Sequence, residues 1–184
     1  GTPAERARRA LRLPRGDWGK TIAHAGFGVT IFGIAALTAW QQEDIRVAQV
    51  GERFEVGQFG VSLDNVEKLR GPNYEATRGT MSVWKGDRKL YELFPEKRFY
   101  PVAGMPTTEA AIHNGILRDM YLVIGDPQDN GGWAVRTYVK PFANWIWVGA
   151  IIMAFGGLMS LSDRRYRVAA GARKAAPSGA VPAE

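Results

Sequence analysis

The 184-residue sequence contains no cysteine and only two histidines, His24 and His113. The lack of cysteine excludes a disulfide-built secreted domain and any zinc site that depends on cysteine. Two histidines are too few to build a multi-histidine metal cage from this chain alone. Charged side chains are missing from two runs of 22 residues, 21–42 and 141–162. Because about 20 apolar residues cross a bilayer, these runs argue against a purely soluble protein.

Both uncharged runs carry aromatic residues near their ends, as membrane spans do. These residues are Trp18, Trp40, Trp145 and Trp147. We therefore predict transmembrane helices over residues 17–42 and 141–162. The alternative interpretation is a pair of helices buried in the core of a soluble domain.

Basic residues are concentrated at the two ends of the chain. Residues 1–20 and 163–184 together hold 11 basic and four acidic side chains, whereas residues 43–140 hold 13 basic and 14 acidic ones. Cationic flanks stay in the cytoplasm, so both termini are predicted to be cytoplasmic and residues 43–140 to be exported. An anionic lipid leaflet accounts for the basic ends without nucleic acid.

The two terminal segments have different patterns. Residues 1–16 open with Thr2-Pro3-Ala4-Glu5, a capping-box pattern that predicts a short basic surface helix up to about Leu13. Residues 163–184 form a basic tail that is rich in alanine, glycine and proline from Ala169 onward, and we expect it to be partly disordered. Because the sequence begins with glycine rather than methionine, we expect further sequence upstream.

The segment 43–140 has the alternation of β-strands rather than helical periodicity. Residues 133–140 alternate, 120–124 form a continuous apolar run, and the parity of the alternation shifts at Gly57-Gln58, which indicates a bulge or a tight turn. Gly86-Asp87 and Asn130-Gly131 are candidate hairpin turns. We predict about seven antiparallel strands in a small sandwich or barrel that packs on the membrane surface.

No catalytic motif is evident in this exported segment. It contains no GxSxG sequence and no phosphate-binding loop. Asp126 and Asp129 lie in a GDPQDNGG stretch that lacks the spacing and the terminal Glu of a calcium loop. Ordinary turn chemistry therefore explains these two carboxylates better than metal binding.

His24 is the unusual residue of the first span, because ionisable side chains in membrane spans are rare and often functional. Gly28 lies one turn further along the same helix face, where it would leave space for a large flat ring. Neutral imidazole is a common axial ligand of haem iron. Two alternatives remain: a histidine bonded to a neighbouring helix backbone, and small residues that only allow close helix packing. Ala150, Ala154 and Gly157 of the second span are predicted to serve such packing.

His113 belongs to the exported segment and is predicted to be an ordinary strand or turn residue. With His24 about 5–9 Å inside the cytoplasmic side and a hydrocarbon core about 30 Å thick, the two histidines do not share one iron in the predicted topology. A second protein ligand would then come from another chain or from upstream sequence.

Four stretches of the sequence resemble one known family. They are DWGKTIAHAGFGVTIFG from Asp17, FEVGQFGVSLDNVE from Phe54, EKRFYPVAGMPTTEAAIH from Glu96, and the long run GDPQDNGGWAVRTYVKPFANWIWVGAIIMAFGGLMSLSDRR from Gly125. Together they span most of the chain between residues 17 and 165. They are similar to the C-terminal part of the CcmF/CycK family, the haem lyase subunit of the system I cytochrome c maturation machinery.

The resemblance implies a function that spacing alone does not. The family works in the bacterial cytoplasmic (inner) membrane, where it assists covalent attachment of haem to apocytochrome c on the periplasmic side. Implied partners are the haem chaperone CcmE, CcmH and CcmI-type subunits, and apocytochrome c. Members carry a b-type haem (haem b) between two transmembrane histidines, and His24, in the AHxG context, is similar to the second of these.

The family's tryptophan-rich WWD segment and its periplasmic haem-binding histidines lie in an N-terminal part, so this sequence is not expected to complete the lyase reaction alone. An alternative function is a non-enzymatic membrane-anchored scaffold whose β domain binds partner proteins. A transporter subunit is a third interpretation, against which two spans without inverted repeats argue.

Overall fold

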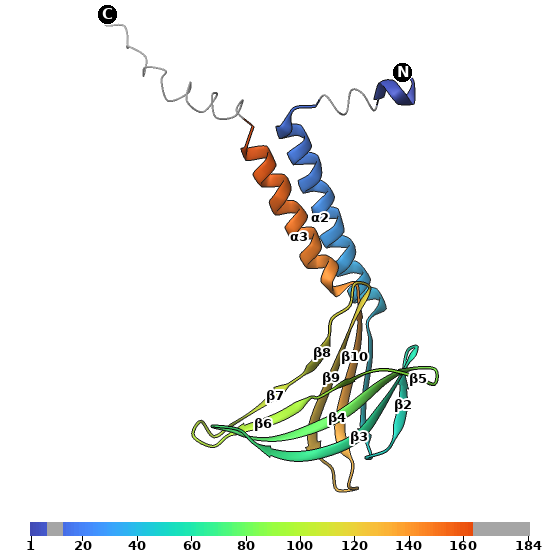
Figure 1. Ribbon diagram of the computed structural model, residues 1–184, viewed down its shortest axis with the longest axis vertical. Coiled ribbons are helices and arrows are strands. Elements are labelled where there is room, and N and C mark those ends of the chain that lie inside the picture. The colour runs from blue at the N-terminus through green and yellow to red at the C-terminus, as the bar shows by residue number, and fades with distance from the viewer. Residues whose placement is uncertain (7–12, 164–184) are drawn as a thin grey trace, which may run out of the picture. The chain divides into compact units, whose positions relative to one another are not determined.

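The computed structural model describes residues 1–6 and 13–163, which divide into two compact units (Figure 1). One unit comprises residues 1–31 and 147–184 and the other residues 32–146, so the boundary crosses both long helices. The predicted capping box is present, because the Thr2 amide donates to the Glu5 carboxylate and the Glu5 amide to the Thr2 hydroxyl. The rest of the predicted N-terminal helix, residues 7–12, and the tail from residue 164 lie outside the described residues.

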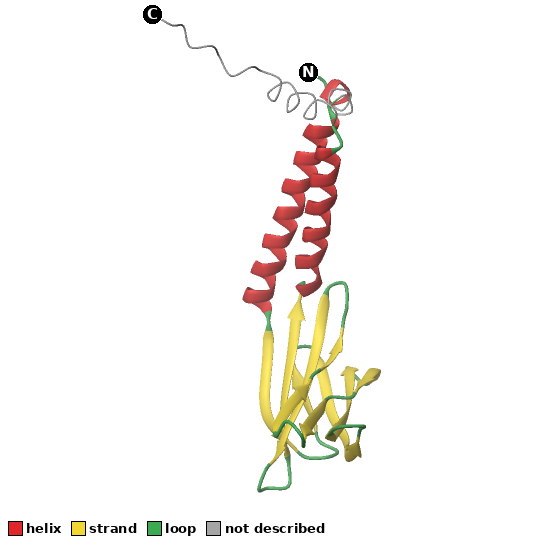
Figure 2. Ribbon diagram, turned by 90° about the vertical axis from the view of Figure 1, so that its left-hand side faces the viewer, coloured by secondary structure: helices red, strands yellow, loops and turns green. Residues whose placement is uncertain are grey.

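The larger unit is an antiparallel β-sandwich (Figure 2). One sheet has the order β1-β10-β9-β8, and the other has the order β2-β3-β4-β6-β7 with β5 paired to β4. The strands are β1 Gln42–Ala48, β2 Arg53–Val56, β3 Phe59–Arg70, β4 Glu75–Lys85, β5 Arg88–Leu93, β6 Glu96–Tyr100, β7 Met105–Glu109, β8 Ala111–His113, β9 Arg118–Pro127 and β10 Trp133–Pro141. A β fold flanked by two long apolar helices is confirmed, and it is a sandwich with ten strands rather than about seven.

Alternating side chains of both sheets form the core between them. Its fully buried members include Val61, Leu63, Met81, Leu122 and Ile124. The alternation of β3 slips by one residue at Asp64, where a bulge interrupts the pairing with β4. The bulge preserves the inward face along a strand of 12 residues, since Val66 packs against the same core.

Tight turns account for most of the chain reversals that the sequence indicated. Gly57-Gln58 is a two-residue turn between β2 and β3, with φ of 62° at Gly57, and not a bulge within one strand. Gly86-Asp87 joins β4 to β5 in the same way, with φ of 57° at Gly86. Glycine at these positions adopts the left-handed conformation without the strain of a Cβ atom.

The two long helices are α2, Arg15–Trp40, and α3, Ala143–Leu161. Both are long and apolar enough to cross a membrane. They differ from the predicted bounds at the ends that adjoin the sandwich. The helix α2 stops at Trp40 because Gln42 already pairs with Val139 in a sheet, and Pro141 still belongs to β10 rather than to α3.

Within the helical unit, α2 and α3 are in contact through glycine. Gly19 and Gly26 of α2, and Gly149 and Gly156 of α3, are buried. A Cβ atom built on Gly26 would lie 2.7 Å from the carbonyl oxygen of Gly149. The backbones therefore touch directly at this contact.

The helix-packing prediction for α3 named the wrong residues. Ala154 is exposed, and a Cβ atom on Gly157 would have no described heavy atom within 4 Å. The contact instead follows Gly149 and Gly156, which are seven residues apart and so lie on one face of the helix. Ala150, one position beyond Gly149, is only half-buried.

Candidate functional site

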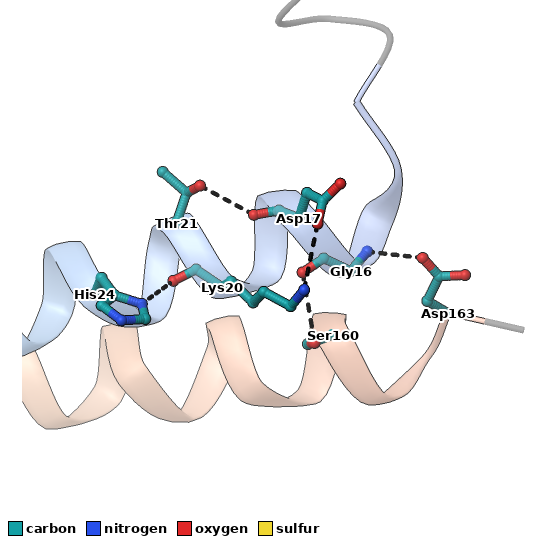
Figure 3. Close-up of polar contacts among 7 residues, drawn as sticks. All are labelled: Gly16, Asp17, Lys20, Thr21, His24, Ser160 and Asp163. Carbon is teal, nitrogen blue, oxygen red and sulfur yellow. Dashed lines mark hydrogen bonds and ion pairs between the residues drawn. The ribbon is translucent and has the colours of Figure 1, made fainter. Parts of the chain in front are cut away.

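His24 lies in the third turn of α2, and its side chain is exposed. Its Nδ1 atom is 2.8 Å from the carbonyl oxygen of Lys20, one turn earlier (Figure 3). Since a carbonyl oxygen only accepts hydrogen bonds, Nδ1 carries the proton in this contact and Nε2 keeps its lone pair. In the neutral ring, this helix contact favours the tautomer with the proton on Nδ1, in which Nε2 has no hydrogen-bond partner among the described residues.

Gly28 lies one turn beyond His24 and is exposed. A Cβ atom built there would meet no described heavy atom within 4 Å. Gly19 and Gly26, by contrast, allow the close approach of α3. Packing between the two helices therefore does not require glycine at position 28, whose open surface lies on the same face as the imidazole of His24.

Polar contacts tie the two helices together on the N-terminal side of His24 (Figure 3). The backbone amide of Gly16 donates to the carboxylate of Asp163 at 2.9 Å, and this carboxylate-bearing residue is only 9% exposed. Thr21 donates its hydroxyl to the carbonyl oxygen of Asp17 at 2.9 Å. Thr21 thus makes the same kind of bond to the preceding turn as His24, without offering a metal ligand.

His113 is an exposed residue of β8, and its ring stacks on Tyr91 with 3.8 Å between the ring centroids. The strand position agrees with the sequence interpretation. Asp126 lies near the end of β9 rather than in a turn, and its ion pair with Lys97 of β6 joins the two sheets. Within residues 1–6 and 13–163, no three His, Asp or Glu side chains gather closely enough to hold a metal ion. A metal ligand in the described chain would therefore act together with groups from elsewhere.

Glu96 is a buried carboxylate in the six-stranded sheet, with an exposure of 5%. Arg78 donates to it at 2.7 Å and Arg98 at 2.8 Å. Burial alone would raise the pKa of Glu96, but the hydrogen bonds from Arg98 and Arg78 outweigh burial and hold the pKa below its usual range. The sequence analysis missed this ion triad, because Glu96 and Arg98 share β6 but only the pairing of β4 with β6 brings Arg78 beside them.

The sandwich also contains a groove of about 660 Å³ that the sequence analysis missed. It opens where β3, β4, β6 and β7 extend beyond the four-stranded sheet (Figure 1). Lys68, Arg70 and Lys97 line it together with Phe99 and Pro106. The sequence pattern alone does not reveal this groove. The bulge at Asp64 turns Lys68 and Arg70 toward the inner face of the sheet, whereas a regular alternation along β3 would place them on the outer face.

Comparisons with known proteins agree on one family. The family model described as CcmF C-terminal beta-sandwich matches residues 39–141. The chain is 60% identical over 176 residues to the cytochrome c-type biogenesis protein Ccl1 of Rhodobacter capsulatus. The aligned region covers 96% of this chain and 27% of that protein. It is 40% identical over 178 residues to the cytochrome c-type biogenesis protein CcmF of Escherichia coli, and that alignment covers 93% of this chain and 27% of the relative.

A solved structure of the cytochrome c haem lyase CcmF has the same fold over 80% of this chain and 25% of that chain, with a TM-score of 0.64 and 19% identity. The chain thus spans about a quarter of the length of the curated relatives that it matches. The family model is named for a β-sandwich, and the residues that it matches, 39–141, contain the sandwich described above. The chain therefore belongs to the CcmF family of cytochrome c-type biogenesis proteins.

Proposed function

We propose that this chain forms the C-terminal part of a membrane haem lyase subunit and assists covalent attachment of haem to apocytochrome c. Within that assembly, His24 is an axial ligand of a b-type haem in the membrane. Attachment adds each of two cysteine S–H groups across a haem vinyl group and forms two thioethers without net oxidation. Because the chain spans about a quarter of its relatives, the reaction belongs to the assembly and not to this segment alone.

The hydrogen bond of the His24 ring is the observation that carries the proposal. Nδ1 lies 2.8 Å from the Lys20 carbonyl oxygen, and a neutral ring that donates this bond has its lone pair on Nε2 of an exposed side chain. A histidine that ligates a metal usually has its other ring nitrogen bonded to a carbonyl or carboxylate in this way. A helix carbonyl one turn earlier therefore orients the imidazole before any iron binds.

The surface next to this nitrogen suits a flat macrocycle. Gly28 presents no side chain on the same face, so a ring bound through Nε2 would not meet a Cβ atom there. When bound, a b-type haem supplies a one-electron redox centre within the membrane. The residues of this chain would hold the iron at Nε2 and exclude water with the apolar surface of α2.

The proposal includes the membrane topology and the partners. Both termini lie in the cytoplasm and the sandwich lies in the periplasm of a bacterial inner membrane, as the basic excess of the two ends favours. The partners are the haem chaperone CcmE, CcmH and CcmI-type subunits, apocytochrome c and membrane lipid; nucleic acid is not among them.

A scaffold function is the second candidate, and the groove beside Phe99 favours it. Lys68 and Arg70 line this groove together with Glu75 and the Lys97–Asp126 ion pair, so charged groups of both signs lie beside Phe99 on a domain whose remaining inner surface is core. In this alternative, the sandwich binds a partner protein and His24 has only a structural role.

Yields of holocytochrome c in cells distinguish the two functions. Full-length protein with His24→Ala is compared with Thr21→Ala, which loses the equivalent bond to the preceding turn but no nitrogen ligand. We expect covalent haem on a reporter cytochrome c to fall at least about tenfold with His24→Ala, the scale of effect that loss of ligand support produces, and to stay near wild type with Thr21→Ala. Unchanged yields with His24→Ala at normal protein levels would favour the scaffold.

A further inference from the structure

The β8–β9 connection, residues 114–117, is bonded to the beginning of α3. Asn144 donates its side-chain amide to the carbonyl oxygen of Gly115 at 2.9 Å. Trp145 donates its indole N–H to the carbonyl oxygen of Ile116 at 2.8 Å, and the backbone amide of Phe142 donates to Leu117 at 2.9 Å. The three successive carbonyl groups of residues 115–117 thus accept hydrogen bonds from residues 142, 144 and 145, around the start of α3.

A buried carboxylate reinforces this attachment. Asp119 is 3% exposed and accepts 2.9 Å hydrogen bonds from the Gly115 backbone amide and from the Asn144 side chain. Hydrogen bonds to an ionised group are stronger than those between neutral groups. The connection is therefore a built and anchored element rather than a loose loop.

The anchored connection exposes two large aliphatic side chains. Ile116 is 82% exposed and Leu117 is 52% exposed. Single exposed apolar residues are common on protein surfaces, so exposure alone says little. Here, however, the backbone of both residues is bonded to Phe142 and Trp145, and these rings form an edge-on cluster with Phe32 of α2. Trp40 also lies against Phe142, with ring centroids 6.1 Å apart.

The aromatic cluster indicates where residues 114–117 lie with respect to a membrane surface. Trp40 is the last residue of α2 and Trp145 lies in the first turn of α3, so both mark the ends of helices long enough to span a bilayer. Tryptophan is enriched at the headgroup level of such helices. In a membrane that α2 and α3 span, Ile116 and Leu117 would therefore lie at the level where an apolar side chain first meets lipid.

We propose that Ile116 and Leu117 insert into the lipid interface beside α3 and form a third membrane contact of the sandwich, in addition to its two covalent connections. The occupant of this surface is lipid, because Trp40 and Trp145 mark the ends of helices long enough to span a bilayer and tryptophan is enriched at the headgroup level. The hydrogen bonds of Asn144 and Trp145 hold the two side chains in place for this insertion. The proposal rests on membrane insertion of α2 and α3 and is independent of haem ligation by His24.

The absence of cysteine makes a site-specific test direct. Ile116→Cys and Leu117→Cys variants of the full chain are labelled with an environment-sensitive fluorophore and reconstituted in vesicles of phosphatidylcholine and phosphatidylglycerol. Val102→Cys is the matched control, since Val102 is also an exposed aliphatic residue, at 100%, but lies in the turn between β6 and β7. Fluorescence is measured with a nitroxide on the upper acyl chain of the lipid and, separately, with aqueous iodide.

We expect the lipid nitroxide to quench labels at positions 116 and 117 at least about twofold, since interfacial side chains lie within ~5–10 Å of the headgroup boundary, and to leave position 102 unaffected. Aqueous iodide should quench the label at position 102 more strongly than the labels at positions 116 and 117. Quenching at 116 and 117 that equals the control with both agents would overturn the proposal in favour of a water-exposed loop. Protection from both agents would also overturn it, because protein rather than lipid would then cover the surface. If one variant does not fold, as judged by circular dichroism, the other position decides.

Discussion

Gly19 of α2 and Gly156 of α3 form a reciprocal contact. A Cβ atom built on either glycine would lie 2.6 Å from the carbonyl oxygen of the other. No real Cβ atom tolerates that distance from a backbone oxygen, and backbone does not yield as a flexible side chain does. The pairing of α2 and α3 within the helical unit therefore depends on glycine at specific positions.

Gly156→Ala should weaken this helix pair, whereas Gly157→Ala should not. The added methyl group at position 156 would meet backbone atoms of Gly19 and Ala23, whereas at position 157 it would meet no described atom within 4 Å. We expect a loss of about 1–3 kcal/mol in the free energy of unfolding for Gly156→Ala and no loss for Gly157→Ala, which gains helix propensity. Unfolding in mixed micelles by added dodecyl sulfate, followed by tryptophan fluorescence, measures both. Equal effects would refute the glycine contact.

Glu96→Gln should destabilise the sandwich and remove a pH dependence. The variant keeps the shape of the side chain but weakens the charge-assisted bonds from Arg78 and Arg98, at a cost of about 2 kcal/mol. The pKa of Glu96 is lowered in the folded state, so its stabilising contribution is present above the pKa of the unfolded chain and is lost as pH falls through the folded value. The unfolding temperatures of wild type and Glu96→Gln should therefore converge over the acidic range below about pH 4.3, the usual pKa of glutamate in an unfolded chain. A constant difference over that range would contradict the role of the ion triad.

The orientation of the chain should follow its charge. A reporter that is active only in the periplasm should be inactive when fused after Glu184 and active when inserted within residues 127–132, the connection between β9 and β10. The 11 basic against four acidic residues of the two ends give the physical reason. The opposite pattern of activity would place His24 near the periplasmic side and refute the proposed topology.

The sequence predicted the features that depend on local periodicity. The alternating residues 133–140 lie in β10, the apolar run 120–124 lies in β9, and Gly86-Asp87 forms the predicted turn, between β4 and β5. The number of strands was underestimated because β7 and β8 are short and separated only by Ala110. Neither has enough residues to show a period of two.

Features that depend on pairing between distant segments were not predictable in the same way. Eight glycines lie in the two long helices, and composition does not say which of them face the partner helix. The seven-residue spacing of Gly19, Gly26 and Gly33 was the available signal. The attachment of Asp119 to Asn144 joins residues 25 positions apart and has no sequence pattern. His24, in contrast, became a candidate from its residue type alone, because an ionisable residue in an uncharged run is rare, and its role stays a prediction.

The central claim is that His24 ligates haem iron through Nε2, and the haem spectrum of the intact assembly tests it most directly. Full-length protein is purified with wild-type sequence, with His24→Ala, and with Thr21→Ala as the control that retains the imidazole. We expect the b-type haem absorption to be lost or strongly weakened with His24→Ala and unchanged with Thr21→Ala. Added imidazole should partly restore it, because it can occupy the vacated space beside Gly28. A wild-type haem spectrum in His24→Ala protein would contradict the account.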